Sequence, residues 1–314
     1  MNAPKVAVVG ASGFIGHHVC VALRDRGCLV VPIGGIRVTR DRIGSIEDMT
    51  NHESEAARRL AEKLSGSEAV VNAAGVSVAQ GTQVGSLVSA NAVFPLILAT
   101  ATKAVGIPRL IHVSSAAVQG RKSVLDSSPQ TFAFSPYSSS KSWGEELVLG
   151  NGPKQTVVYR PPGVHGRDRP TTKLTVRVAS SPLAAYAGDG AANTPQALVE
   201  NVADAIAFMS VTDLTIPSIV NHPSEGLTVR SYLRRLGDRE PKRIPEPAAV
   251  PILGAAVMLG NVFSSLSAHS RRLEVLWRGQ EQAPSWLTAA GWRPPRGLDG
   301  WDKLGVLCRS ESAL

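Results

Sequence analysis

The segment Lys5-Val6-Ala7-Val8-Val9-Gly10-Ala11-Ser12-Gly13-Phe14-Ile15-Gly16-His17-His18-Val19 decides the fold of this chain. An apolar run with the length of a buried strand meets three glycines, and a helical pattern follows. Gly10 permits a tight turn, Gly13 lets the backbone approach a bound group, and Gly16 lets the helix lie close to the strand. The first N–H groups of such a helix attract phosphates. The spacing is GxxGxxG rather than GxGxxG, and we interpret it as a dinucleotide-binding turn whose contact residues are Gly10, Ser12, Gly13, Phe14, Ile15 and Gly16.

Strand and helix patterns alternate after this turn. Apolar runs predict strands near residues 29–33, 69–73, 109–113 and 156–160. Helical patterns lie between them, for example over His17–Arg26, Glu53–Leu64 and Val84–Val105. Such alternation predicts βαβ units with right-handed crossovers. The expected fold class is α/β, with a Rossmann-type, doubly wound parallel sheet and a smaller C-terminal substrate lobe.

The pattern changes after about residue 165. Short apolar pieces then alternate with connections rich in Pro and Gly, such as Arg167–Thr172 and Glu240–Pro251. We therefore expect an NAD(P)-binding Rossmann domain over residues 1–165, to which residues 197–222 return with a helix over Ala197–Met209. Residues 166–314 are expected to form mainly the substrate-binding lobe.

Composition narrows the class of protein. The chain has 314 residues, with 43% hydrophobic and 18% charged residues, as is ordinary for a soluble enzyme. The formal net charge is +8, but the basic residues are scattered and rarely interleaved with aromatics, so we expect no nucleic-acid partner. Cys20, Cys28 and Cys308 have no metal-binding spacing. We expect no metal site, no signal peptide before the first strand, and a cytoplasmic location.

One later stretch, Pro247–Leu266, is strongly apolar. Proline, glycine and serine interrupt it, which argues against a membrane span. We expect a core or interface helix here and no membrane partner. An alternative is that the part around Ile252–Phe263 lines an apolar pocket.

The residues after the second predicted strand bear on the choice of cofactor. An acidic residue at this point would bind the ribose 2′-hydroxyl of NAD. The chain has no acid here before Asp41, whereas Arg37 and Arg40 could each form paired hydrogen bonds with a 2′-phosphate. The expected cofactor is therefore NADP, with NAD as the alternative.

The stretch Tyr137-Ser138-Ser139-Ser140-Lys141 places a phenol and an ammonium group on one face of a predicted helix. Ser115 follows a predicted strand, at the sheet edge where α/β folds bind ligands. A cation about 4 Å from the phenol would favour the phenolate by about 4 kcal/mol at an effective dielectric constant near 20, or about three pK units. We predict that Tyr137 is a general acid–base group whose pKa Lys141 lowers, and that Ser115 holds the substrate oxygen.

Further motifs follow the same order along the chain: Glu47-Asp48-Met49-Thr50, Val71-Asn72-Ala73-Ala74-Gly75, Asn91-Ala92-Val93-Phe94-Pro95, Val113–Gly120, Tyr159–Gly166 and Ala290–Pro294. With them, the chain resembles an extended short-chain dehydrogenase/reductase of the nucleotide-sugar epimerase/dehydratase superfamily.

That resemblance implies roles for individual residues. Tyr137 would be the catalytic acid/base, Ser115 would assist it, and Lys141 would bind the nicotinamide ribose. Asn91 would open a helix beside the site, and homodimers through two helices per subunit are expected. Further cofactor contacts would come from Asp48, Met49, Ala73, Ala74, Gly75, Pro161 and Val164.

Departures from the family pattern narrow the chemistry. Sugar dehydratases carry an Asp-Glu pair where this chain has Ala116 and Ala117, so elimination chemistry is not expected. In 4-epimerases an acidic residue after the second strand binds an NAD that stays in the enzyme. This chain has Gly34 and Gly35 at that place, which argues against a 4-epimerase.

The first hypothesis is a ketoreductase. Hydride passes from the nicotinamide to a ketone carbon of a nucleotide-activated 4-keto-6-deoxysugar while Tyr137 protonates the oxygen. Alternatives are an NAD-dependent nucleotide-sugar 4-epimerase, a reductase of a lipid-, steroid- or polyketide-like ketone, and a non-catalytic dinucleotide sensor.

Overall fold

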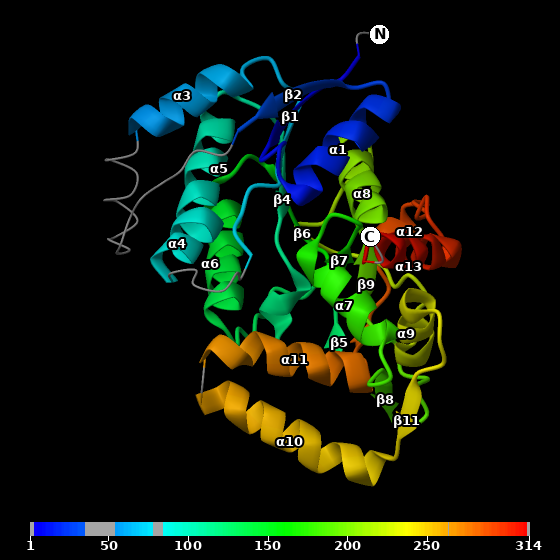
Figure 1. Cartoon of the computed structure of the whole chain (residues 1–314). Coiled ribbons are helices and arrows are strands. Elements are labelled where there is room, and N and C mark those ends of the chain that lie inside the picture. Colours follow the sequence, from blue (N-terminus) through cyan, green and yellow to red (C-terminus); the bar gives the residue numbers. More distant parts are fainter. Residues whose placement is uncertain (1–2, 35–53, 78–83, 263, 313–314) are drawn as a thin grey trace.

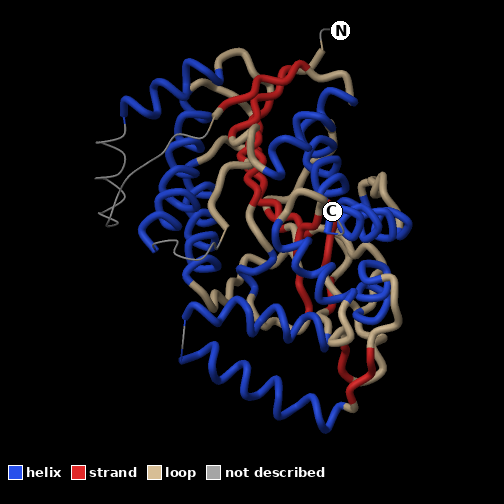
Figure 2. Tube along the Cα trace, viewed as in Figure 1, coloured by secondary structure: helices blue, strands red, loops and turns tan. Residues whose placement is uncertain are grey.

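A computed structural model of the chain describes residues 3–34, 54–77, 84–262 and 264–312. A six-stranded sheet lies at its centre, with the strand order β10-β6-β4-β3-β1-β2 and every pair parallel (Figures 1 and 2). Its strands are β1 (Lys5–Val9), β2 (Leu29–Ile33), β3 (Ala69–Asn72), β4 (Arg109–Val113), β6 (Gln155–Arg160) and β10 (Ile219–Asn221). The chain winds outward from β1 to β2 and then crosses to the other side of β1, which confirms the predicted doubly wound α/β fold.

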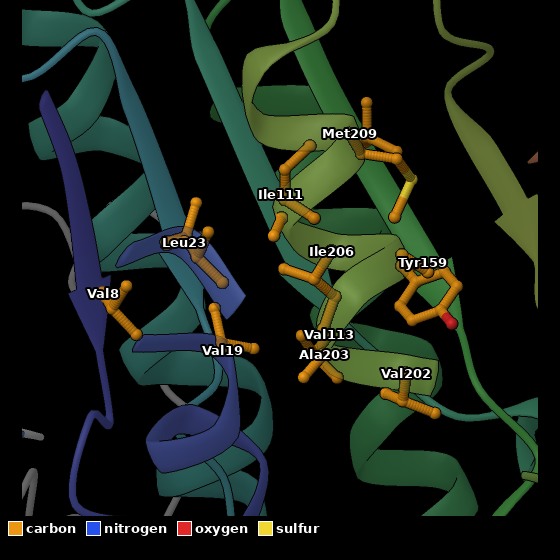
Figure 3. Close-up of a cluster of buried hydrophobic side chains, with 14 of the residues drawn as sticks. Val8, Val19, Leu23, Ile111, Val113, Tyr159, Val202, Ala203, Ile206 and Met209 are labelled. Carbon is orange, nitrogen blue, oxygen red and sulfur yellow. The ribbon is translucent and has the colours of Figure 1, made fainter. Parts of the chain in front are cut away.

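The two faces of the sheet follow from the alternation of side chains along each strand. Val6 and Val8 enter one buried cluster, whereas Ala7 and Val9 enter the other. Helices α1 (Phe14–Asp25) and α8 (Val199–Val211) cover the first cluster, as Figure 3 shows. The second cluster lies under α3 (Ser54–Leu64), α5 (Phe94–Ala104) and α6 (Pro136–Asn151). Helices on both faces bury the inner strands of the sheet, as parallel sheets require, whereas the edge strand β2 stays partly exposed.

A continuous helical stretch, Val84–Ala104, consists of α4 (Val84–Val88), one π-helical turn (Ser89–Val93) and α5. It is long and apolar enough to cross a membrane, with a mean hydropathy of 1.7, but 72% of that window is buried inside the protein, as in a core helix. Asn91 lies in the π-helical turn, so the prediction that it opens a helix is wrong. The helix begins before Asn91, and the wider turn directs the Asn91 carbonyl toward Gly144 of α6.

The second half of the chain forms a third core. Trp301 is completely buried there among α7 (Pro170–Ser180), α9 (Val229–Gly237) and α13 (Leu298–Ser312). Three small parallel sheets connect these helices to the rest: β7 (Gly163–His165) with β9 (Gln196–Leu198), β8 (Ala185–Ala187) with β11 (Lys242–Ile244), and β5 (Val124–Leu125) with β12 (Glu281–Gln282). A short helix, α12 (Trp286–Ala289), precedes α13. The domain division near residue 165 stays a prediction.

Three predicted segments differ from the structure. The helix expected over Ala197–Met209 begins two residues later, because β9 takes Gln196–Leu198. Helix α7 begins at Pro170, inside the expected connection Arg167–Thr172. In Glu240–Pro251, β11 is followed by α10 (Glu246–Val262), and Pro251 lies inside this helix.

Helix α10 also differs in its surroundings. It packs against α11 (Ser264–Arg278) at the lower edge of Figure 1. Of its side chains that the structure describes, only Ala249 and Leu253 are buried, so α10 is not a core helix; the other expectation, an interface helix, stays a prediction. The three cysteines are buried and form no disulfide.

Candidate active site

The turn from β1 to α1 has the tight geometry that its glycines predict. Gly10 has a φ of 81°, and a Cβ on it would lie 2.6 Å from the backbone nitrogen of Ala74. A Cβ on Gly16 would lie 2.1 Å from the Gly10 carbonyl oxygen. The Gly13 N–H donates to that same oxygen at 2.9 Å. Any side chain at Gly10 or Gly16 would therefore push apart β1, α1 and the end of β3.

The same turn fits a dinucleotide. Helix α1 begins at Phe14, and no side chain caps its first turn. Ser12 and Gly13 are exposed, and among the described residues a Cβ on Gly13 would approach only the Gly10 carbonyl oxygen. The helix thus offers uncapped N–H groups and open backbone to a phosphate.

Helix α6 is positioned at its first residue. Ser135 accepts a hydrogen bond from the Ser138 N–H at 3.2 Å, and the Ser138 hydroxyl accepts one from the Ser135 N–H at 2.9 Å. Pro136 follows this cap as the first helical residue. This reciprocal capping fixes where the helix starts, and hence where Tyr137 in its first turn points.

Tyr137 keeps its proton at neutral pH. Burial raises the pKa of the phenol, while its hydrogen bond with Ser115 and the charges of Arg169 and Arg272 lower it less. The phenol therefore lies beside Ser115, as predicted. The cations that act on it are the two arginines, and the predicted effect of Lys141 on the tyrosine pKa stays a prediction.

Lys141 instead reaches the end of the neighbouring strand. Its ammonium donates to the carbonyl oxygen of Val113 at 3.0 Å. A Cβ on Gly75 would lie 3.0 Å from this ammonium and 2.9 Å from Asn91 Oδ1, so the three residues are neighbours. Burial lowers the pKa of Lys141 to about 8, and the charge of Glu145 opposes that shift. The predicted contacts Gly75, Asn91 and Lys141 thus form one cluster beside β4.

Glu145 and Arg160 form a buried ion pair that the sequence analysis missed. Arg160 donates to Glu145 Oε2 through Nη2 at 2.6 Å, and the Ser114 hydroxyl donates to the same carboxylate. Both side chains are almost completely buried. The signal was present in the sequence, because Glu145 follows Lys141 by four residues and so continues the face of Tyr137 and Lys141.

A cavity of about 510 Å³ opens in front of Ser115 and Tyr137. Ile15, Pro161 and Val164, which were predicted to contact the cofactor, also line it. The described residues that line it include no Asp or Glu but do include three arginines. These are Arg169, Arg271 and Arg272. Apolar residues of α7 and α11 cover the opposite wall, namely Leu174, Val178, Leu273, Val275 and Leu276.

Two of the arginines leave positive charge in the cavity. Arg169 donates to the Val164 carbonyl oxygen at 2.7 Å, and its guanidinium lies 5.2 Å from the centre of the Phe14 ring. Neither Arg169 nor Arg272 forms an ion pair with a carboxylate in the described part of the chain, whereas Arg271 pairs with Glu274 at 2.9 Å. The cavity can therefore receive an anionic group.

The remaining predicted contacts divide into two sets. Ala73 and Ala74 lie against Gly10, at the turn. Arg37, Arg40, Asp48 and Met49 lie outside the described residues. The described residues of α10 do not line the cavity, so the apolar wall comes from α7 and α11 and not from the predicted stretch around Ile252.

Solved structures with similar folds cover almost the whole chain. One is "MoeE5 in complex with UDP-glucose and NAD", with a TM-score of 0.64 and 18% identity over 99% of this chain and 100% of that chain. Another is UDP-glucuronic acid 4-epimerase from Bacillus cereus with NAD, with a TM-score of 0.66 and 19% identity over 98% and 99% of the two chains. A third is dTDP-4-dehydrorhamnose reductase from Bacillus anthracis with NADP, with a TM-score of 0.63 and 15% identity over 96% and 99%. At these identities the likeness shows the fold.

The family follows from the sequence itself. No curated protein matches the chain significantly. The sequence model of the NAD dependent epimerase/dehydratase family, however, matches residues 6–221. This range contains the glycine turn, Ser115, Tyr137 and Lys141, and it exceeds half of the chain. The chain belongs to the NAD-dependent epimerase/dehydratase family, as its motifs had predicted, and is an enzyme that uses a nicotinamide dinucleotide.

Proposed function

We propose that this protein is a ketoreductase that uses NADPH to reduce the keto group of a nucleotide-activated 4-keto-6-deoxysugar. The observation that carries the proposal is the lining of the cavity. A protonated Tyr137 lies there beside Ser115, with Ala116 and Ala117 next to them and with no carboxylate among the described lining residues. Elimination of water from a sugar needs an acid and a base, whereas reduction needs one proton donor.

The residues divide the chemistry between them. A bound NADPH supplies a hydride to the ketone carbon. The Ser115 hydroxyl donates a hydrogen bond to the ketone oxygen and holds it beside Tyr137, which gives its proton to that oxygen. Lys141 would bind the nicotinamide ribose next to Gly75 and Asn91. Arg169 and Arg272 supply positive charge for the phosphates of an anionic substrate.

The preference for NADPH rests on Arg37 and Arg40. Replacing both with Ala should weaken NADPH binding much more than NADH binding, because only NADPH carries the 2′-phosphate. Fluorescence titration of the two cofactors measures this difference. Equal losses for both, or no loss, would refute the assignment.

A 4-epimerase is the second candidate. It is favoured by the full-length likeness to a UDP-glucuronic acid 4-epimerase that contains NAD. The cofactor content of the freshly purified protein separates the two activities. Bound NAD that resists dialysis would favour the epimerase, whereas reversible binding of NADPH would favour the reductase.

Replacing Tyr137 by Phe tests the mechanism. The loss of the hydroxyl should lower kcat by about 10²–10⁴-fold, as is typical for a general acid. The dissociation constant of NADPH should change little, since the phenyl ring still fills the same space. Turnover is measured as loss of NADPH absorbance with 4-keto-6-deoxysugar nucleotides. Unchanged turnover in the variant would exclude Tyr137 as the proton donor.

A further inference from the structure

Helix α10 presents an uninterrupted apolar surface to the solvent. Residues 247–258 contain no polar or charged side chain. Val250, Ile252 and Met258 are 50%, 49% and 69% exposed. A helix that is apolar on all sides normally lies in a protein core or in a membrane. The exposed side of α10 therefore lacks the polar residues that a solvated surface would carry.

The exposed residues lie on one broad side of the helix. Pro247, Pro251, Ala255 and Met258 are exposed and follow one another at intervals of three or four residues. The buried residues Ala249 and Leu253 point to the opposite side. That side faces α11, and α10 is the outermost element at this edge of the molecule (Figure 1). Its apolar surface is thus accessible along the whole described length.

Unpaired cations lie at the amino-terminal end of this surface. Arg239, Lys242 and Arg243 are exposed and form no ion pair within the described part of the chain. Arg239 and Arg243 donate to the carbonyl oxygens of Ser180 and Gly188. Two acids on this part of the chain are already engaged, because Arg230 binds Glu240 and Arg278 binds Glu246. Positive charge therefore borders the apolar helix.

We propose that α10 docks the protein onto the surface of an anionic lipid bilayer. The apolar side would enter the boundary between headgroups and acyl chains, as interfacial helices do. Arg239, Lys242 and Arg243 would contact anionic headgroups, and the net charge of +8 adds long-range attraction. This surface is separate from the cavity in which we propose the reduction. The two are connected through α11, which packs against α10 and contributes Leu273 and Leu276 to the cavity wall. It departs from the sequence-based expectation of no membrane partner.

Co-sedimentation of the full chain with lipid vesicles tests the proposal. Vesicles of phosphatidylcholine with phosphatidylglycerol should bind the protein, pure phosphatidylcholine should bind it more weakly, and added salt should remove the difference. The double change Ile252→Asp and Met258→Asp should weaken binding by at least about ten-fold. Replacing Lys242 and Arg243 with Gln should weaken binding to the anionic vesicles by about five-fold per charge at low salt.

A matched control lies in the loop that leads into β10. Leu214, in the loop between α8 and β10, is 48% exposed, and Leu214→Asp should leave vesicle binding unchanged. NADPH titration and circular dichroism show whether each variant is folded, independently of any ketone substrate. The proposal is overturned if neither vesicle binds the protein or if the double variant binds as well as the wild type. It is also overturned if the α10 variants convert a dimer to monomers, since the face would then join two copies of the chain.

Discussion

Buried titratable side chains around the cavity have fixed charges at neutral pH. The phenol of Tyr137 is protonated, because burial raises its pKa. His165 is neutral, because burial lowers its pKa to about 4. It accepts or donates hydrogen bonds with Thr172, Gln196 and Tyr232 in the cavity wall. The site therefore combines a ready proton donor with a neutral polar wall and the positive charge of the arginines.

His165 predicts a loss of stability in acid. Its folded-state pKa is about 4, against an ordinary value of 6.5. Between these values the unfolded chain binds a proton that the folded protein excludes, so the free energy of unfolding falls as the pH falls from about 6.5 to 4. The full effect is about 3 kcal/mol. In His165→Gln the fall over this range should be smaller by up to that amount, as urea unfolding at several pH values would show.

The His165→Gln measurement needs a second buried histidine and a control variant to be taken into account. His112, buried in β4, also has a pKa well below its ordinary value, so part of the acid sensitivity should remain in the variant. His17→Gln, at an exposed position of α1, controls for the loss of a histidine as such. An unaltered pH dependence in His165→Gln would show that folding does not lower the pKa of this side chain.

Helix α6 carries the proposed proton donor and also packs against the central sheet. Its face toward β4 carries Tyr137, Lys141 and Glu145 at successive intervals of four residues. Lys141 reaches the end of β4, and Glu145 binds Arg160 of β6. Gly144 lies against the π-helical turn that contains Asn91. Small displacements of α6 would therefore move the proton donor relative to Ser115.

Gly144 and Gly150 form a matched pair on α6. A Cβ on Gly144 would lie 2.0 Å from the Asn91 carbonyl oxygen, whereas a Cβ on Gly150 would meet nothing within 4 Å. Gly144→Ala should lower the free energy of unfolding by about 2 kcal/mol or more and reduce turnover. Gly150→Ala should be neutral or stabilise by up to about 1 kcal/mol. Equal urea midpoints for the two variants would contradict the packing described for α6.

The buried ion pair between Glu145 of α6 and Arg160 of β6 predicts a second effect on the free energy of unfolding. Glu145→Ala would leave the Arg160 guanidinium buried without its carboxylate, which should destabilise the protein by about 3–5 kcal/mol. Val306→Ala on the exposed face of α13 is the surface control, with an expected change within about 0.5 kcal/mol. Thermal or urea unfolding measures both. A small effect at Glu145 would mean that water reaches this pair.

Most of the elements were predictable because their signals are local. Strands β1, β2 and β4 have the boundaries that their apolar runs predict, and in β1 and β4 this follows because buried parallel strands are apolar on both faces. A helix was expected in Pro247–Leu266, but Glu240–Pro251 was also expected to be a connection, because Pro247 and Pro251 resemble helix breakers; α10 begins at Glu246 and continues through Pro251. Lys141 follows Tyr137 at the predicted spacing, but its partner is the Val113 carbonyl oxygen. Such pairings depend on which strand lies opposite the helix, and spacing along the chain does not contain that information.

At the scale of the whole molecule, the carboxyl ends of the parallel strands place the functional groups together. The glycine turn follows β1, Gly75 lies just after β3, and Ser115 lies just after β4. The second half of the chain closes the cavity with α7 and α11, including two arginines without carboxylate partners among the described residues. A nicotinamide dinucleotide and an anionic ketone could thus meet in front of Tyr137.

The stoichiometry of one reaction tests the central proposal most directly. The protein is incubated with a nucleotide-activated 4-keto-6-deoxysugar and NADPH carrying deuterium at the transferable position. The proposal predicts one NADP formed per sugar alcohol, deuterium at the former ketone carbon, and no such product with Tyr137→Phe. Inversion of a sugar carbon without net consumption of NADPH, on NAD that stays bound to the protein, would contradict it and identify an epimerase.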